Sequence, residues 1–154
     1  MRVTFISGNL MRHPGLRAIA HGCNCRGIMG AGVALQVRTQ YPKCFQEYST
    51  MCKSGRLKLG GVHAWKDVST GMMVFNMATQ QDPGADATLP ALEQSLLTLE
   101  KECISRKIAT VGLPKIGAGI GGLRWEDVKA LLVDMSSQSE SSDVDFLVFE
   151  EFVP

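Results

Sequence analysis

Residues 17–39 read RAIAHGCNCRGIMGAGVALQVRT, and this stretch decides the fold class. It opens with a short apolar run at residues 17–20, which has the character of a buried strand and ends at His21. A glycine-rich segment follows at residues 22–32, and residues 31–39 then combine Val and Leu with good helix formers. A strand that leads through glycines into a helix is the unit from which α/β domains are built.

The rest of the chain continues this alternation of strand and helix signals. Apolar residues recur at three- and four-residue steps from Leu89 to Cys103 and again from Trp125, which is the spacing of one helix face. We therefore predict an α/β domain with a largely parallel or mixed sheet, helices on both faces, and a ligand site at the carboxyl ends of the strands. Further strands are expected at residues 2–7, 62–65, 72–77, 108–113 and 145–149, further helices at 42–51, 89–103 and 125–135, and a surface loop at 136–143.

The composition fits a single domain over residues 1–154. Hydrophobic residues make up 45% of the chain and charged residues 20%, which leaves enough apolar material for a core. The net charge of +1 argues against a strongly basic nucleic-acid binder or a membrane-surface protein. No apolar run approaches the ~18–20 residues of a membrane span, and residues 1–13 lack the apolar stretch of a secretory signal. We expect a cytoplasmic monomer with no membrane partner.

The five cysteines are an odd number in a chain that is too long for a disulfide-stapled mini-domain. Cys23 and Cys25 form a Cys-x-Cys pair, which differs from the Cys-x-x-Cys of redox and zinc sites. No second pair of Cys or His residues stands at ligand spacing. We therefore expect reduced, mostly buried thiols, no metal site and no cofactor.

Two glycine-rich loops stand at predicted strand-to-helix junctions, at residues 27–32 and 117–122. Such loops approach a ligand closely and bind anions through backbone N–H groups. Two of them in one small domain suggest two walls around a pyrophosphate; the alternative is that both are only tight turns. The first lacks the Gly-Lys-Ser/Thr of a P-loop. The second fits G-x-G-x-x-G without a complete βαβ unit after it, which argues against a hydride-transfer enzyme.

Several motifs, taken in order along the chain, resemble those of the macro domain family. They are Gly8-Asn9-Leu10, HGCNCRGIMGAGVA at residues 21–34, Tyr41-Pro42, and LPKIGAG at residues 113–119. The resemblance covers nearly the whole chain and is strongest to the branch that contains the yeast ADP-ribose-1″-phosphate phosphatase. Terminal ADP-ribose protein glycohydrolase and the antitoxins that remove ADP-ribose from DNA lie close to that branch.

This resemblance implies a three-layer α/β/α fold with a mixed, mostly parallel central sheet and a cleft that binds ADP-ribose or ADP-ribose-1″-phosphate. ADP-ribosylated macromolecules are a further class of partner that it implies. Asn9 would contact adenine and Asn24 the distal ribose, although each also suits a plain loop position. The implied ligand contacts are Gly8, Asn9, Leu10, Asn24, Met29, Gly30, Ala31, Gly32, Val33, Thr79, Pro114, Ile116, Gly117, Ala118, Gly119, Ile120 and Gly121.

Two side chains are candidates for catalysis. His21 ends a predicted strand beside Asn24 and is of a type that exchanges protons near neutral pH; a buried structural histidine is the alternative. Asp82 lies in the loop after the strand at residues 72–77, from which it could reach the distal ribose; an Asp-Pro turn residue is the alternative.

The chain departs from its glycohydrolase relatives at two positions. Residues 78–81 read ATQQ, with Gln80 where those relatives have a lysine, and Gly121 stands where the protein glycohydrolase has an aspartate. Because glutamine cannot form an imine, the first difference argues against attack by a lysine amine on the anomeric carbon. The leading hypothesis is hydrolysis of the phosphate monoester of ADP-ribose-1″-phosphate by water, helped by His21 or Asp82. The alternatives are a reader that binds ADP-ribose without turnover and an ADP-ribosyl hydrolase that works without the lysine.

Overall fold

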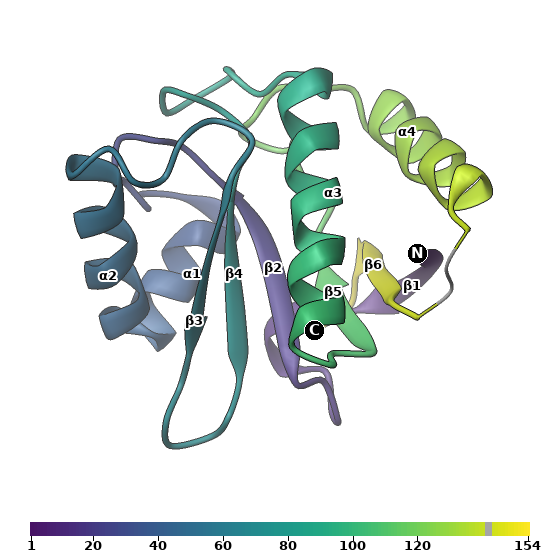
Figure 1. Cartoon of the computed structure of the whole chain (residues 1–154), viewed down its shortest axis with the longest axis horizontal. Coiled ribbons are helices and arrows are strands. Elements are labelled where there is room, and N and C mark those ends of the chain that lie inside the picture. The colour runs from purple at the N-terminus through teal and green to yellow at the C-terminus, as the bar shows by residue number, and fades with distance from the viewer. Residues whose placement is uncertain (141–142) are drawn as a thin grey trace.

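A computed structural model describes residues 1–140 and 143–154 and places a six-stranded sheet between two layers of helices (Figure 1). The strand order is β1-β6-β5-β2-β4-β3, and neighbouring strands are parallel except for the antiparallel pair β3 and β4. The strands are β1 (Arg2–Gly8), β2 (Ala18–Cys23), β3 (Val62–Lys66), β4 (Met73–Ala78), β5 (Thr110–Leu113) and β6 (Asp145–Phe152). The helices are α1 (Gly32–Gln40), α2 (Pro42–Lys53), α3 (Leu89–Ser105) and α4 (Trp125–Gln138), and a short 3-10 helix, η1 (Leu10–Arg12), follows β1.

Two apolar clusters, one on each face of the sheet, form the core. The first packs α3 and α4 against the sheet and includes Leu96 and Leu132. The second lies under α1 and α2 and includes Val37 and Tyr48. Because β4 is buried along its whole length and β2 nearly so, both strands are covered on two faces and carry nearly continuous apolar sequences.

The mixed, mostly parallel sheet with helices on both faces confirms the predicted fold class. Strand β2 differs most from its prediction: it continues to Cys23, because His21 pairs with Asn76 of β4 instead of opening a loop. The sequence did not predict η1, which begins where the Asn9 side chain accepts a hydrogen bond from Met11. Of the loop predicted at residues 136–143, the first three residues form the end of α4; residues 141 and 142 lie outside the described residues.

Among the described residues, no helix combines the length and apolar character needed to cross a membrane. All five cysteines are free thiols, and four of them are buried. The same part of the chain holds no group of three or more His, Cys, Asp or Glu side chains arranged to bind a metal ion.

Candidate functional site

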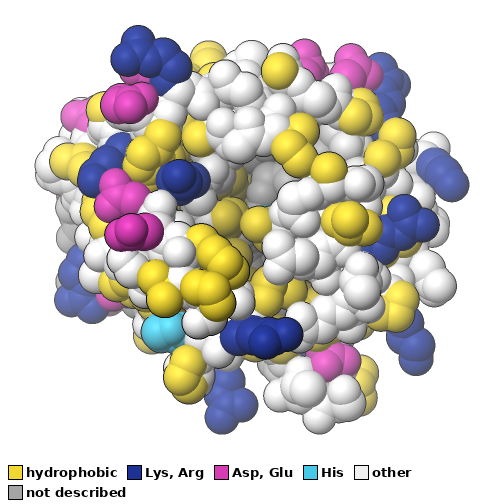
Figure 2. All heavy atoms as spheres, turned by 180° about the vertical axis from the view of Figure 1, so that it is seen from behind, with side chains coloured by type: hydrophobic (Ala, Val, Ile, Leu, Met, Phe, Trp, Pro, Cys, Tyr) yellow, Lys and Arg dark blue, Asp and Glu magenta, His cyan; other side chains and the backbone are white. Residues whose placement is uncertain are grey.

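A cavity of about 620 Å³ opens at the edge where the parallel strands end. Residues that follow β1, β2, β4 and β5 line it together with the last residues of β6, so five strands contribute to one site. A volume of this size is typical of small-molecule sites. The face seen from behind is hollowed near its centre and carries charged side chains of both signs around the hollow (Figure 2). Because charges of both signs surround the hollow, we expect a ligand to be recognised by shape and hydrogen bonds more than by a strong electrostatic field of one sign.

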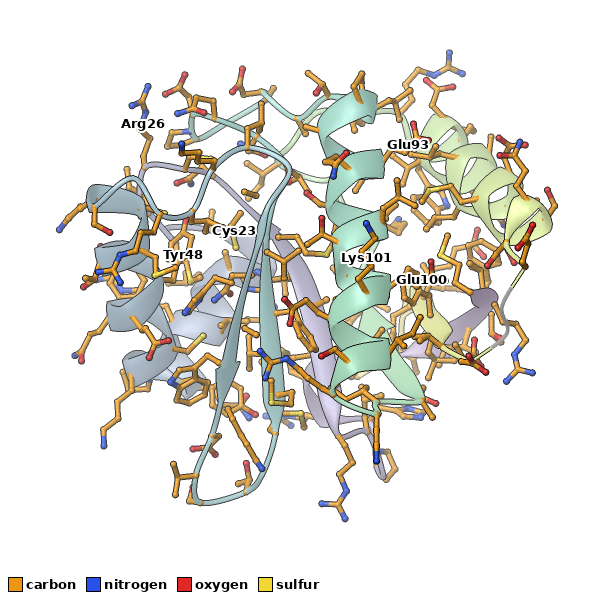
Figure 3. All side chains as sticks on the ribbon, in the orientation of Figure 1. Cys23, Arg26, Tyr48, Glu93, Glu100 and Lys101 are labelled. Carbon is orange, nitrogen blue, oxygen red and sulfur yellow. The ribbon has the colours of Figure 1, made fainter. Side chains whose placement is uncertain are left out.

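The first glycine-rich loop leads from β2 into α1 and is held in shape by Asn24. The side-chain oxygen of Asn24 accepts from the backbone N–H groups of Arg26 at 3.0 Å and Ile28 at 3.3 Å, and its amide donates to the Ile28 carbonyl at 2.8 Å. Tyr48 projects from α2 toward the end of β2 (Figure 3), and its hydroxyl donates to the Asn24 carbonyl at 2.6 Å. Asn24 lines the cavity, but the loop uses most of its hydrogen-bonding capacity, which favours the plain loop role.

The second glycine-rich loop follows β5 and faces the first across the cavity. A Cβ atom added at Gly32, whose φ is +59°, would lie 3.2 Å from Ile120, so the two loops approach each other closely. The Gly117 carbonyl accepts from the Leu123 N–H at 3.0 Å and closes the loop. Within the described part of the chain, the N–H groups of residues 119–121 donate to no protein acceptor. These free donors, and the start of α1 opposite, form the kind of backbone site that binds phosphate.

Nearly all of the ligand contacts implied by the resemblance lie in the cavity wall. From the first loop these are Gly30, Ala31, Gly32 and Val33; from the second, Pro114, Ile116, Gly117, Ala118, Gly119, Ile120 and Gly121; and from elsewhere, Gly8, Asn9, Leu10, Asn24 and Thr79. Met29 is the exception. Its side chain is fully buried in the core beneath the first loop, so it supports the loop and does not line the cavity.

Aromatic side chains gather at the end of the cavity formed by β1 and β6. Phe149, Phe152 and Trp125 line this end together with Asn9 and its neighbours. Phe152 is 71% exposed, an unusual placement for a phenylalanine and one that a flat ligand could cover. The Asn9 side-chain oxygen already accepts from the Met11 N–H at 3.1 Å, which supports the turn role of Asn9 and leaves its amide donors available to a ligand.

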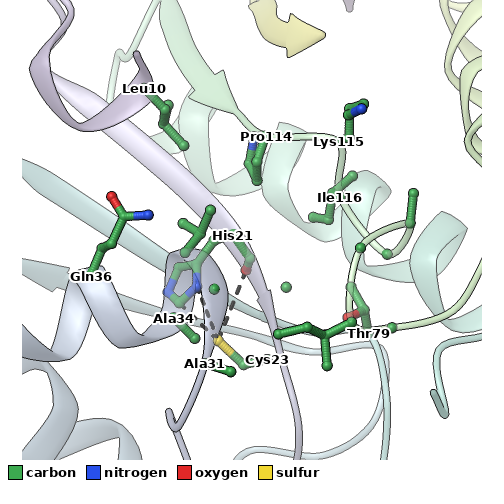
Figure 4. A pocket seen from close by; sticks show the side chains of 18 of the residues that line it. Leu10, His21, Cys23, Ala31, Ala34, Gln36, Thr79, Pro114, Lys115 and Ile116 are labelled. Atoms are coloured by element: carbon green, nitrogen blue, oxygen red, sulfur yellow. Dashed lines mark hydrogen bonds between the residues drawn. The ribbon is translucent and has the colours of Figure 1, made fainter. Parts of the chain in front are cut away.

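The opposite end of the cavity, beside β2 and β4, holds the side chains of His21, Cys23 and Thr79 (Figure 4). Thr79 is 1% exposed, and its hydroxyl is buried without a hydrogen-bond partner among the described residues, which is costly unless a ligand or water supplies one. Gly22 makes room for this hydroxyl, because a Cβ at that position would lie 2.8 Å from the Thr79 oxygen. Gln80 donates from its amide nitrogen to the carbonyls of Asp82 at 2.6 Å and Gly84 at 2.7 Å. Gln80 therefore clamps the loop that follows β4.

His21 lies in the cavity wall at the head of a row of polar side chains across the sheet. His21, Asn76 and His63 are cross-strand neighbours on β2, β4 and β3. The His21 Nε2 atom donates to the Asn76 side-chain oxygen at 2.6 Å, and the Asn76 amide donates to His63 Nδ1 at 3.0 Å. His63 Nε2 in turn donates to Glu47 of α2 at 2.8 Å. Burial lowers the pKa of His21 to about 4, against the opposing effect of its hydrogen bond with Asn76, so the imidazole is neutral at pH 7.

The lowered pKa of His21 predicts that the protein loses stability in mild acid. Between its folded pKa of about 4 and its ordinary value of 6.5, the unfolded state binds a proton that the folded state does not, so stability falls as the pH drops. We expect this group to remove about 2 kcal/mol from the free energy of unfolding between pH 7 and pH 5. Urea unfolding at both pH values checks this. The His21→Gln variant should lose that part of the pH dependence, and an unchanged dependence would contradict the assignment.

Asp82 does not join His21 in the cavity. Its carboxylate is 55% exposed and lies 2.6 Å from the guanidinium of Arg26, which projects outward at the rim (Figure 3). Its neighbours Gln80, Pro83 and Gly84 line the cavity, whereas Asp82 does not. The structure thus separates the two predicted catalytic residues, because the Gln80 clamp and the Arg26 ion pair turn the Asp82 side chain away.

Sequence reasoning missed several residues that build the site. Asn76 lies inside an apolar strand and gave no signal except that it is a polar residue there. Glu150 and Phe152 extend β6 beyond its predicted end and line the cavity. Trp125, the first residue of the predicted helix at 125–135, packs against the core and lines the cavity as well.

Comparison with known proteins identifies the relatives of this chain. A family model described as Macro domain matches residues 20–132. The DNA ADP-ribosyl glycohydrolase of Mycobacterium tuberculosis is 34% identical over 96% of this chain, and the chain spans about two fifths of the length of that protein (42%). The ADP-ribose 1″-phosphate phosphatase of Lodderomyces elongisporus is 31% identical over 89% of this chain and 94% of its own length. Among solved structures, the macrodomain of Mycobacterium tuberculosis DarG has a TM-score of 0.84 and 31% identity, and covers 99% of this chain and 97% of its own.

Proposed function

We propose that this chain, which belongs to the macro domain family, binds ADP-ribose in the cavity and hydrolyses the phosphate monoester of ADP-ribose-1″-phosphate. The observation that carries the proposal is the order of groups along one cavity: aromatic side chains, then two glycine-rich loops, then polar side chains. ADP-ribose has the same order, with an adenine base, a diphosphate and a distal ribose. Each part of the ligand thus meets groups of matching chemistry.

The two loops supply the binding energy for the charged centre of the ligand. Among the described residues the N–H groups of residues 119–121 have no protein acceptor, and the start of α1 lies opposite them. Lys115 also lines the cavity and adds one positive charge. At the distal end, the Thr79 hydroxyl would gain the partner that it lacks when a ribose hydroxyl or phosphate oxygen binds beside it.

Hydrolysis of the monoester needs stabilisation of the transferred phosphoryl group more than a protein nucleophile. A water oxygen forms a bond to phosphorus, the bond from phosphorus to the oxygen on C1″ breaks, and inorganic phosphate and ADP-ribose leave. Backbone donors of the second loop would stabilise the phosphoryl oxygens in the transition state. His21 is neutral and can accept a hydrogen bond from the attacking water, although its lowered pKa makes it a weak base.

Removal of ADP-ribose from DNA is a second candidate, favoured by the names and 34% identity of the mycobacterial relatives. Against it stands the Gln80 side chain, which is no nucleophile and is committed to two backbone carbonyls. One experiment separates the candidates. The protein is incubated with ADP-ribose-1″-phosphate and, in parallel, with an ADP-ribosylated DNA oligonucleotide; released phosphate and released ADP-ribose are measured. Phosphate release alone supports the proposal. Release from DNA alone would replace it with the glycohydrolase, and binding without either release would leave a reader.

Asp82 and His21 should contribute unequally to phosphate release. Because Asp82 is exposed at the rim and paired with Arg26, we expect Asp82→Asn to lower the rate less than about threefold. His21 lines the cavity, so His21→Ala should lower it by about tenfold or more. Steady-state phosphate release by both variants, with thermal unfolding to verify folding, tests this. A tenfold loss in Asp82→Asn would instead place that carboxylate at the reacting centre.

A further inference from the structure

Among the described residues that line the cavity, Glu150 is the only one with an acidic side chain. It lies on β6 at the aromatic end, between Phe149 and Phe152, both of which also line the cavity. Its side chain is 32% exposed, so it is held partly away from solvent. A carboxylate in such a place needs a physical reason, because removing a charge from water costs free energy unless it is paired.

A β-bulge places Glu150 at this position. Ile6 of β1 pairs with Phe149, and the next residue, Ser7, pairs with Glu151. Glu150 is therefore the extra residue, with no partner on β1. Bulges of this kind break the regular alternation of a strand and redirect a side chain, and they are common beside functional sites. The irregularity lies where β6 reaches the cavity.

Two donors from α4 fix the Glu150 carboxylate and leave one oxygen free. The indole N–H of Trp125 donates to Oε1 at 3.1 Å, and the Lys129 ammonium donates to the same oxygen. No donor to Oε2 is found among the described residues. The hydrogen bond from Lys129, followed by that from Trp125, lowers the pKa of Glu150, so the group is ionised at neutral pH and can only accept hydrogen bonds.

We propose that Glu150 selects adenine at the aromatic end of the cavity by accepting a hydrogen bond from the exocyclic amine of the base. This inference rests on the proposed binding of ADP-ribose. Asn9 also lines the cavity; its oxygen binds the Met11 N–H, and its amide N–H donors suit a ring nitrogen of adenine. Asn9 and Glu150 thus present a donor and an acceptor, the complement of the amine and ring nitrogens of adenine. Hypoxanthine carries a carbonyl oxygen in place of the amine, and an ionised carboxylate repels it.

The test compares ADP-ribose with its hypoxanthine analogue, inosine diphosphate ribose, by isothermal titration calorimetry. Wild-type protein should bind ADP-ribose about ten- to a hundredfold more tightly than the analogue, the value of a hydrogen bond to a charged group. In Glu150→Gln the amide can donate to the carbonyl, so the ratio should fall to about threefold or less. Glu151→Gln is the matched control: this neighbour carries the same charge, contacts Ser7 at 3.2 Å, does not line the cavity, and should keep the wild-type ratio.

The outcomes separate this inference from the proposed function. If wild type binds ADP-ribose and Glu150→Gln keeps the full preference for adenine, Glu150 does not select the base and the inference is overturned, while the proposed function stands. If wild type binds neither compound, the proposed function itself fails. Binding of ADP-ribose by Glu150→Gln also reports that this variant is folded.

Discussion

Replacing Gly119 with glutamate is expected to weaken ADP-ribose binding by about a hundredfold or more, because like charges brought together cost several kcal/mol. Gly119 lies in the second loop and lines the cavity, and a Cβ atom added there would meet no other atom within 4 Å. A side chain can therefore be attached without disturbing the loop. The glutamate would carry its carboxylate into the space proposed for the diphosphate. Calorimetry with ADP-ribose measures the loss.

Gly119→Gln is the matched control for that experiment, since glutamine has nearly the same size without the charge. We expect it to weaken binding much less than glutamate does, and both variants to unfold at the wild-type temperature. Equal losses of ADP-ribose affinity in the two variants would mean that the size of the added side chain, and not its charge, prevents binding. Unchanged binding by Gly119→Glu would remove the second loop from the anion site.

Replacing Asn76 with alanine should lower the free energy of unfolding by about 4 kcal/mol, because each buried hydrogen-bonding group left unpaired costs about 1–3 kcal/mol. Asn76 is fully buried and is the only link between His21 and His63 in the described row across β2, β4 and β3. Alanine would leave the His21 Nε2 donor and the His63 Nδ1 acceptor without their Asn76 partner, on side chains that are both buried. Urea denaturation at pH 7 measures the difference.

Ser95→Ala is the control for Asn76→Ala. Ser95 is also fully buried, but its hydroxyl makes one long hydrogen bond of 3.4 Å to the Ala78 carbonyl. We expect it to cost less than about 1 kcal/mol. Equal losses of unfolding free energy in the two variants would mean that the hydrogen bonds of Asn76 to His21 and His63 stabilise the fold no more than the single bond of Ser95. The placement of His21 would then need another explanation.

Much of the fold could be predicted because its signals are local. Helix α3 buries one face, and its apolar residues recur at the spacing of that face. Strands β2 and β4 are covered on both faces, and their sequences are nearly continuous apolar runs. The residues at which strands end were harder to predict from the sequence. His21 is polar and resembles the start of a loop in sequence, yet it lies within β2 because its partner Asn76 is 55 residues away. The bulge in β6 likewise depends on the pairing of β6 with β1, which no local pattern records.

The two glycine-rich loops of the cavity wall could be predicted, but the roles of single side chains could not. Glycine-rich segments at strand-to-helix junctions are typical of anion sites, and both segments lie in the cavity wall. Asn9, Asn24 and Gln80 instead spend their polar atoms on nearby backbone groups, and only the folded loops reveal this. Asp82 is turned away from the cavity by Arg26, 56 residues earlier in the chain. Glu150 is positioned by the bulge in β6 and by two hydrogen-bond donors from helix α4.

A titration of ¹⁵N-labelled protein with ADP-ribose, followed by NMR, tests the central claim most directly. If ADP-ribose binds in the cavity, the amide signals of Gly30, Gly32, Gly119 and Gly121 shift and saturate together. The signal of Gly71, in the turn between β3 and β4 at the opposite end of the sheet, should stay in place. If the loop glycines do not shift at millimolar ADP-ribose, or if shifts appear only away from the cavity, the assignment of this cavity to ADP-ribose is wrong.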